Sequence, residues 1–256
     1  MAVIINLREL KRLAATEGVP QGVIEKDMAL SAALKTIAGS ELANQAVFKG
    51  GTAIKKVYFP EARFSEDLDF TATGLDRNGC LRLLKDALEG RTINEAITFK
   101  ELEEEKTRAG LRASVKYAGP LGHAQRIRFD FNFRENLAEK PLAREVIDQY
   151  GFGHAELSVM SIEEIFAEKL HALCSRSAPR DLYDAWFLFG KGIKLDRRVL
   201  DRKFAYYDET FDAKKAVENA RKSKDNWTKA LRHLLKKLPE FRQVELEVEK
   251  KLQEIS

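Results

Sequence analysis

Two short motifs carry residue types suited to phosphate chemistry, and the first is a glycine-rich turn. The apolar run 46–48 is followed by Lys49 and then by Gly50-Gly51-Thr52. A strand that ends in glycines and enters a helix leaves backbone N–H groups pointing outward, and phosphate binds to such donors. The motif therefore predicts a phosphate-binding turn.

The second motif is a pair of aspartates in the stretch Ser65-Glu-Asp67-Leu-Asp69-Phe. At positions i and i+2 of a strand, Asp67 and Asp69 share one face and lie roughly 7 Å apart along the chain, while Leu68 turns toward the core. Ser65 is expected on the aspartate face. Two neighbouring carboxylates repel each other unless a cation lies between them, so the pair predicts a Mg²⁺ site.

Each motif alone is more often structural, since paired glycines usually form a turn and an Asp-x-Asp pair usually faces solvent. Their order favours function, because Asp67 follows Gly51 by sixteen residues. Asp130 is a third candidate ligand: positions 127, 129, 131 and 133 are apolar, which places Asp130 on the opposite face of its strand. If that strand neighbours the Asp67 strand, three carboxylates converge. The alternative is a solvent-facing aspartate paired with arginines.

Lys169 lies within the apolar stripe of a predicted helix over 161–173, which a capping box at Ser161 opens. An amine at a core-facing position must meet an anion. A triphosphate in a cleft between domains would be such an anion, and a carboxylate of the first domain is the alternative. On the next helix Asp181 and Asp184 share a face. The cap and helix-dipole interpretation is strong for Asp181 and weaker for Asp184.

Other site types find little support. The four histidines lack zinc spacing, and no GxSxG, HExxH or P-loop motif occurs. The segment 212–238 holds nine Lys/Arg against three acidic residues. Such a run is usually a solvated face, but it is basic enough to bind an RNA backbone. Trp227 within it is expected to pack in a core. The candidate phosphate contacts are Lys214, Lys215, Arg221, Lys222, Lys224 and Lys229.

Elements of both kinds must position these residues. Hydrophobic periodicity predicts helices at 7–16, 24–37 and 77–88, a helix from the glycine turn to Tyr58, and strands at 46–48, 67–71, 111–117 and 127–133. From Ser161 only helices are expected, at 161–173, 180–189, 227–238 and 241–255. The prediction is an α+β fold with a domain at 1–155 and an all-helical domain at 156–256, joined near Gly151-Phe-Gly-His154.

Composition narrows the class of protein. The chain has 256 residues, of which 44% are hydrophobic and 33% charged, with a net charge of +4. Its two cysteines, Cys80 and Cys174, are too few for a disulfide scaffold and suit a reducing cytoplasm. The N-terminal stretch becomes charged too early for a secretory signal, and no 18-residue apolar run occurs. Membrane, secreted and fibrous classes are therefore excluded, and a cytoplasmic protein is expected.

The motifs together resemble the AbiEii/MenT family of nucleotidyltransferase toxins, the toxic halves of toxin–antitoxin or phage-defence pairs. The resemblance runs from Ile24 to Phe189 and rests on IEKDMAL, VFKGGTAIKKVYF, RFSEDLDF, EKLHAL and RDLYDAW, in that order. It implies a polymerase-β-like nucleotidyltransferase core with a helical second domain. It also implies that the substrate is an NTP and that the cofactor is Mg²⁺, with two ions in the site. The implied acceptor is the end of a tRNA, and the implied protein partner is a cognate antitoxin.

The resemblance also assigns roles to residues. Asp67 and Asp69 match the metal-binding pair, and Asp130 matches a further metal ligand least closely. Lys169 matches the nucleotide-contacting lysine, and Asp184 an essential aspartate. The phosphate-side motif corresponds to Gly50, Gly51, Thr52 and Ser65; the wider superfamily more often has Gly-Ser where this chain has Gly-Gly-Thr.

The expected reaction is in-line attack of an acceptor hydroxyl on the α-phosphorus of an NTP, with release of pyrophosphate. Asp67, Asp69 or Asp130 would activate the hydroxyl. Two alternatives stay open: nucleotidyl or phosphoryl transfer to a protein side chain, and a non-catalytic nucleotide- or RNA-binding module.

Overall fold

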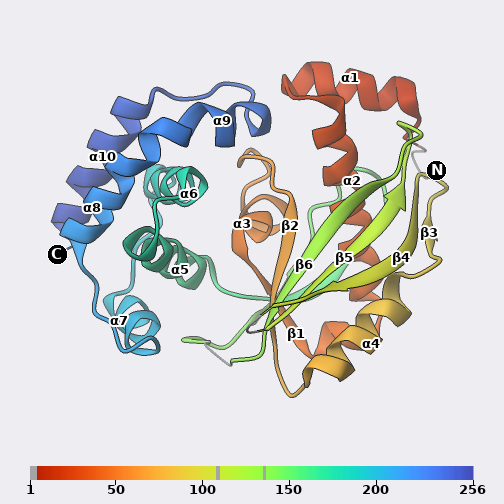
Figure 1. Cartoon of the computed structure of the whole chain (residues 1–256), viewed down its shortest axis with the longest axis horizontal. Coiled ribbons are helices and arrows are strands. Elements are labelled where there is room, and N and C mark those ends of the chain that lie inside the picture. Colours follow the sequence, from red (N-terminus) through yellow and green to blue (C-terminus); the bar gives the residue numbers. More distant parts are fainter. Residues whose placement is uncertain (1–4, 108–109, 135–136, 256) are drawn as a thin grey trace. The chain divides into compact units, whose positions relative to one another are not determined.

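A mixed sheet forms the frame of the first half of the chain in the computed structural model, which describes residues 5–107, 110–134 and 137–255. The chain divides into two units (Figure 1). The sheet unit comprises Met1–Glu135 and Pro141–Met160, and the helical unit comprises Asn136–Lys140 and Ser161–Ser256. A sheet with helices followed by helices alone confirms the α+β architecture.

Eight strands form the sheet within the described residues, in the order β3-β4-β5-β6-β2-β1-β8-β7. β2 lies near its centre, parallel to β6 and antiparallel to β1. The hairpin of β5 and β6 is antiparallel, as the alternation of apolar residues predicts. The strand bounds are β1 (Ala46–Lys49), β2 (Asp67–Ala72), β3 (Thr92–Ile93), β4 (Ile97–Glu105), β5 (Leu111–Ala118), β6 (Gln125–Asn132), β7 (Leu142–Glu145) and β8 (Glu156–Val159).

Helices of the sheet unit begin and end at residues suited to those positions. Asn6 caps the first by accepting hydrogen bonds from the N–H groups of Arg8 and Glu9, and Gly18 ends it in the left-handed region. Asp76 caps the helix over 77–88 through the N–H of Gly79. The helical bounds are α1 (Leu7–Glu17), α2 (Gln21–Ala38), η1 (Glu41–Asn44), α3 (Gly50–Ala53), the π-turn η2 (Ile54–Tyr58) and α4 (Arg77–Leu88).

The sheet has one apolar face and one polar face. Leu68 and Phe70 of β2 are buried, and the Phe70 ring stacks on Phe131 of β6 with centroids 5.0 Å apart. α2 contacts β6, and α4 contacts β4 and β5, so these helices cover the apolar face (Figure 1). Because strand side chains alternate, Asp67 and Asp69 lie on the opposite face.

In the helical unit, Ser161 caps α5 by accepting a hydrogen bond from the N–H of Glu164. The predicted capping box is half formed, because the Glu164 carboxylate accepts hydrogen bonds from the N–H groups of Ala138 and Glu139 instead. Glu164 is therefore buried. The bounds are α5 (Ile162–Ser175), α6 (Pro179–Gly190), α7 (Arg197–Ala205), α8 (Ala213–Lys222), η3 (Ser223–Asn226), α9 (Trp227–Leu231), η4 (Arg232–Leu234) and α10 (Phe241–Glu254).

The predicted helix over 227–238 is wrong in its second half. The segment breaks into α9 and η4, and Leu235 is extended at φ −137° and ψ 137°. Pro239 lies downstream and disfavours the helical region for the residue before it. Leu234 and Leu235 are nevertheless buried, so the apolar spacing reflects a core rather than a continuous helix.

Both cysteines are free and buried, as expected for a chain without a disulfide scaffold. Burial raises the pKa of Cys80 to about 12 and that of Cys174 to about 11. In the part of the chain that the structure describes, no helix combines the length and the apolar character needed to cross a bilayer.

Candidate active site

The glycine turn lies directly against the aspartate pair. β1 ends at Lys49, which is opposite Asp69 in the antiparallel pairing with β2, and α3 begins at the next residue. Gly50 has φ +79°, and a Cβ atom there would lie 2.9 Å from Cγ of Asp69. A side chain at position 50 would therefore be strained and would displace the carboxylate. Glycine allows the turn backbone to approach Asp69 closely.

Thr52 fixes the start of α3 to the start of β2. Its buried hydroxyl donates a hydrogen bond of 2.5 Å to the backbone carbonyl of Asp67. The N-cap residue Lys49 supplies no side-chain hydrogen bond to the first turn of α3, which Gly50, Gly51 and Thr52 form. The turn thus presents backbone N–H groups beside a carboxylate pair, the arrangement that the sequence predicts for phosphate.

Asp130 lies in the strand next to the aspartate pair. β6 runs parallel to β2, with Asp130 opposite Asp69 and Arg128 opposite Asp67. Residues opposite each other share a face, so the three carboxylates occupy one side of the sheet. The carboxylate of Asp130 also accepts a hydrogen bond of 2.7 Å from Arg112. Asp130 therefore lies beside the aspartate pair and also binds an arginine, so features of both interpretations are found.

The donor chemistry of the pair suits Mg²⁺. Within the described ranges no three His, Cys, Asp or Glu side chains form a ready-made metal cluster. Mg²⁺, however, is commonly held by one or two carboxylates together with substrate phosphates and water. Asp67 and Asp69 offer such hard oxygen donors, and the neighbouring Asp130 carboxylate binds Arg112.

Lys55 organises the loop that leads to Ser65. Its buried ammonium donates hydrogen bonds to the carbonyl oxygens of Pro60, at 2.6 Å, and Ala62, at 3.0 Å. It also lies 4.2 Å from the ring centroid of Phe64. Ser65 itself is half-buried in this loop, two residues before β2. The sequence predicts that it shares the aspartate face of the strand, but it lies outside the strand.

Lys56, the next residue of the π-turn, binds a different part of the sheet unit. Its ammonium lies 2.5 Å from Asp27 of α2, and the Tyr150 hydroxyl donates to the same carboxylate oxygen. Burial lowers the pKa of Lys56, and burial raises that of Tyr150. Sequence reasoning missed both lysines as site supports. The available signal was a Lys-Lys pair inside an otherwise apolar helix after the glycine turn.

The helical unit brings Lys169 together with both aspartates of α6. The Lys169 ammonium lies 2.9 Å from Asp184 and 3.1 Å from Asp181. Arg176 also contacts Asp181 at 2.8 Å. Burial raises the pKa of Asp181, but Lys169 and Arg176 outweigh it and hold that pKa below its usual value. Asp181 lies in the first turn of α6, as the helix-dipole interpretation predicts, but it is not the cap, because Ala178 is the N-cap and makes no side-chain cap bond.

The predicted site residues thus form two groups, one in each unit. Gly50, Gly51, Thr52, Asp67, Asp69 and Asp130 gather around β2 in the sheet unit. Lys169 and Asp184 gather between α5 and α6 in the helical unit.

The basic segment 212–238 is exposed at most of its lysines. Arg221 differs from them, because it pairs with Glu249 of α10 at 3.0 Å. The expectation for Trp227 is confirmed: it is buried, its indole N–H donates to the carbonyl of Pro239, and its ring packs on Phe241.

Comparisons with known proteins identify the family and the fold of the chain. MenT4, a nucleotidyltransferase toxin from Mycobacterium tuberculosis H37Rv, has a similar fold, with a TM-score of 0.79 and 22% sequence identity over 97% of this chain and 88% of that chain. A search of the curated proteins matched none of them. The family model described as "Nucleotidyl transferase AbiEii toxin, Type IV TA system" matches residues 32–253. The chain belongs to the AbiEii family of nucleotidyltransferase toxins.

Proposed function

We propose that this toxin transfers a nucleotide from an NTP to the hydroxyl at the 3′ end of a tRNA, releases pyrophosphate, and thereby inhibits growth. The observation that carries the proposal is the approach of the Gly50 turn to the Asp69 carboxylate. This approach supports the proposal, because backbone N–H groups of the kind that can bind phosphate then lie beside two hard oxygen donors, as nucleotidyl transfer requires. A cognate antitoxin is the expected protein partner, and phage defence is the biological setting that the family suggests.

Most of the predicted residues have a role in this reaction. Gly50, Gly51 and Thr52 bind the phosphates that leave as pyrophosphate. Asp67 and Asp69 hold Mg²⁺, two ions in the proposed site, and when bound these ions neutralise charge on the triphosphate. In the helical unit, Lys169 contacts the nucleotide, and Asp184 fixes the position of the Lys169 ammonium. Asp130 lies next to Asp69 and is a candidate to accept the proton of the attacking hydroxyl.

An RNA acceptor is favoured by the exposed lysines of the helical unit. Phosphate contacts from such residues supply affinity that does not depend on sequence. These residues are exposed and lie in the predicted basic segment: Lys214, Lys215, Lys222, Lys224 and Lys229. Transfer to a protein side chain requires no such surface. A non-catalytic module is disfavoured because Asp67, Asp69 and Lys169 are all present.

Labelling with each NTP in turn tests the proposal. The purified protein, Mg²⁺ and an α-³²P-labelled NTP are incubated with total RNA or with lysate protein, and an Asp69→Asn variant serves as the control. We expect label on RNA of tRNA size, at the 3′ end, with none in the control or after chelation of the metal. Label on protein instead would establish the alternative acceptor, and absence of any transfer would refute the proposed enzyme.

A further inference from the structure

The polar face of the sheet continues from the aspartate pair across three more strands. Because residues opposite each other share a face, the strand pairings define rows of side chains that cross β2, β6, β5 and β4. One row consists of Asp69, Asp130, Arg112 and Glu105, and the next consists of Asp67, Arg128, Ser114 and Glu103.

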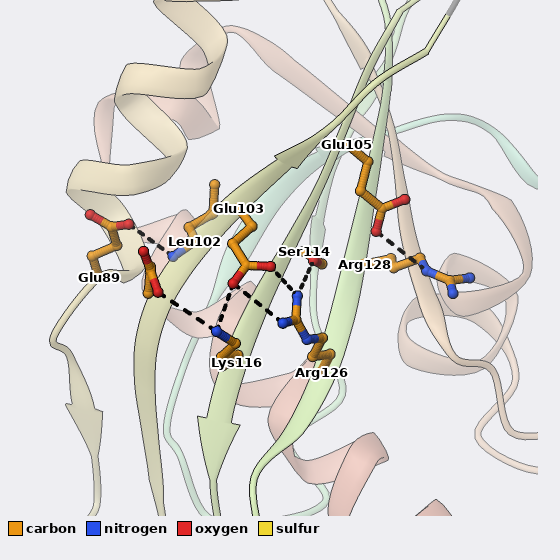
Figure 2. Close-up of polar contacts among 9 residues, drawn as sticks. Glu89, Leu102, Glu103, Glu105, Ser114, Lys116, Arg126 and Arg128 are labelled. Carbon is orange, nitrogen blue, oxygen red and sulfur yellow. Dashed lines mark hydrogen bonds and ion pairs between the residues drawn. The ribbon is translucent and has the colours of Figure 1, made fainter.

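Read along the strands, basic side chains gather on β6 and β5 of this face, although β6 also carries Asp130, and acidic side chains gather on β4. Next to the aspartates comes a basic column on β6 and β5, which consists of Arg112, Lys116, Arg126 and Arg128. Beyond it, β4 carries an acidic column of Glu101, Glu103 and Glu105, of which Figure 2 labels Glu103 and Glu105. Glu103 binds Arg126 and lies 2.6 Å from Lys116, while Glu105 lies 3.7 Å from Arg128.

The basic column is available to a ligand. The side chains of Arg112, Arg126 and Arg128 are 47%, 45% and 59% exposed. Ion pairs at such exposed positions are weak, so a phosphate can replace a glutamate oxygen at little cost. Arg128 is the loosest of the arginines, because its nearest carboxylate contact is the long one to Glu105, and it lies opposite Asp67.

The order of the strands places the glycine turn and the basic column on opposite sides of β2. The glycine turn follows β1, on one side of β2, and the basic column begins on β6, on the other side. In-line displacement at phosphorus places the attacking and leaving oxygens on opposite sides of the phosphorus. If the leaving phosphates occupy the Gly50 turn, the attacking hydroxyl approaches from above β6 and β5.

We propose that the basic column binds the phosphodiester backbone of the acceptor RNA strand and directs its terminal hydroxyl to the aspartate pair. This inference rests on the proposed function and names the surface that the acceptor uses. The acceptor oxygen bonds to the α-phosphorus, the bond from that phosphorus to the pyrophosphate oxygen breaks, and the hydroxyl proton passes to a carboxylate of the site. The acidic column holds the basic side chains in extended conformations and repels phosphate. A single RNA strand is therefore confined to the basic column.

The test compares Arg126→Gln/Arg128→Gln with a control that removes equal charge from the same unit. Arg82→Gln/Arg91→Gln is suitable, because both arginines are exposed and lie in or next to α4, which contacts the apolar side of the sheet. The acceptor is a short single-stranded RNA with a free 3′ hydroxyl. For the Arg126/Arg128 variant we expect the KM for RNA to rise about tenfold or more, with NTP affinity unchanged.

Salt dependence and a second variant sharpen the test. Loss of two phosphate contacts should reduce the slope of log K against log salt by about 1.4 for a single strand. Glu103→Gln, which releases Arg126 and Lys116, should raise RNA affinity several-fold and steepen the slope. The control should match the wild type in both.

The outcomes separate this inference from the proposed function. If the wild type labels RNA but the Arg126/Arg128 variant keeps its KM and salt slope, the basic column is refuted and the function stands. If that variant loses NTP affinity instead, the column serves the donor nucleotide and the inference is wrong. If the wild type labels no RNA, the function and the inference fail together.

Discussion

Two regions of the molecule hold charged side chains in opposite ways: the polar face of β4, β5 and β6 in the sheet unit, and the contact between α5 and α7 in the helical unit. On the sheet unit the charges of β4, β5 and β6 lie on an open face, where the side chain of Arg128 is 59% exposed. In the helical unit Lys203 and Glu164 pair at 2.6 Å with side chains that are 1% exposed each. Exposed pairs exchange partners readily, whereas a buried pair cannot lose one member without leaving an unpaired charge. The open charges are thus suited to substrates and the buried ones to the fold.

The buried pair also fixes a backbone segment. Glu164 receives two backbone hydrogen bonds from the 138–139 segment, and Lys203 further contacts Glu168 at 3.1 Å. All of these partners lie within the helical unit. Four substitutions test this contrast between open and buried charge, from the largest expected effect to the smallest.

Asp69→Asn should abolish transfer and toxicity while changing the free energy of unfolding by no more than about 0.5 kcal/mol. Asn keeps the shape of the half-buried side chain, which lies on the polar face beside Asp130, so the fold should tolerate the change. Activity is measured with labelled NTP and stability by urea unfolding. An active Asp69→Asn protein would show that the open carboxylates do not serve the reaction.

Lys203→Met should destabilise the protein by about 3–5 kcal/mol, because it leaves the Glu164 carboxylate buried without its cation. The matched control is Lys222→Met at an exposed position of α8, which should stay within about 0.5 kcal/mol of the wild type. Both are measured by urea unfolding at pH 7. Equal stability of the two variants would show that buried and exposed charges do not differ in their contribution to the free energy of unfolding.

Gly50→Ala should cost about 1–2 kcal/mol in backbone strain and should also greatly reduce transfer, because its Cβ would push against Asp69. Gly74→Ala separates the two effects. Gly74 has φ +72°, and no atom lies within 4 Å of its added Cβ, so it should show similar strain with normal activity. Full activity of Gly50→Ala would mean that the close approach of the turn is dispensable.

Arg176→Gln should destabilise the protein by about 0.5–1 kcal/mol at pH 7, since Arg176 is largely exposed although Asp181 is buried. Burial raises the pKa of Asp181, but Lys169 and Arg176 lower it further, so the net shift is downward. A lowered pKa contributes stability above the unfolded value of about 3.9 and loses it as the pH falls through the folded value. The deficit of Arg176→Gln should therefore shrink below about pH 4. A deficit that is independent of pH would show that Arg176 acts through packing.

The sequence predicts those elements whose periodicity is regular, and α4 is found at its expected bounds of 77–88. β4 is not predicted from the sequence, because its pairing with β5 shifts between Phe99 and Leu102 and this shift interrupts the alternation of apolar residues. The N–H of Leu102, at this bulge, is satisfied by Glu89, a contact between distant positions (Figure 2). β7 is exposed at all four residues, so it has no apolar pattern to detect.

The site is predictable where local geometry suffices. Period-2 spacing places Asp67 and Asp69 on one face, and helical spacing places Asp181 and Asp184 near each other. The partners of these residues depend on tertiary contacts. The Lys56–Asp27–Tyr150 cluster joins three segments that are far apart in the chain, and neither spacing nor composition indicates such a meeting.

The burial of both cysteines has a practical consequence for labelling chemistry. Maleimides and iodoacetamides react with thiolates, and a thiol whose pKa is about 11 or 12 is almost entirely protonated near pH 7. The two natural cysteines should therefore react little with such reagents, and a dye would attach selectively to a cysteine introduced at an exposed site. Lys222→Cys and Arg82→Cys would provide one attachment point on each unit, from which fluorescence energy transfer could follow nucleotide and RNA binding without removal of either natural thiol.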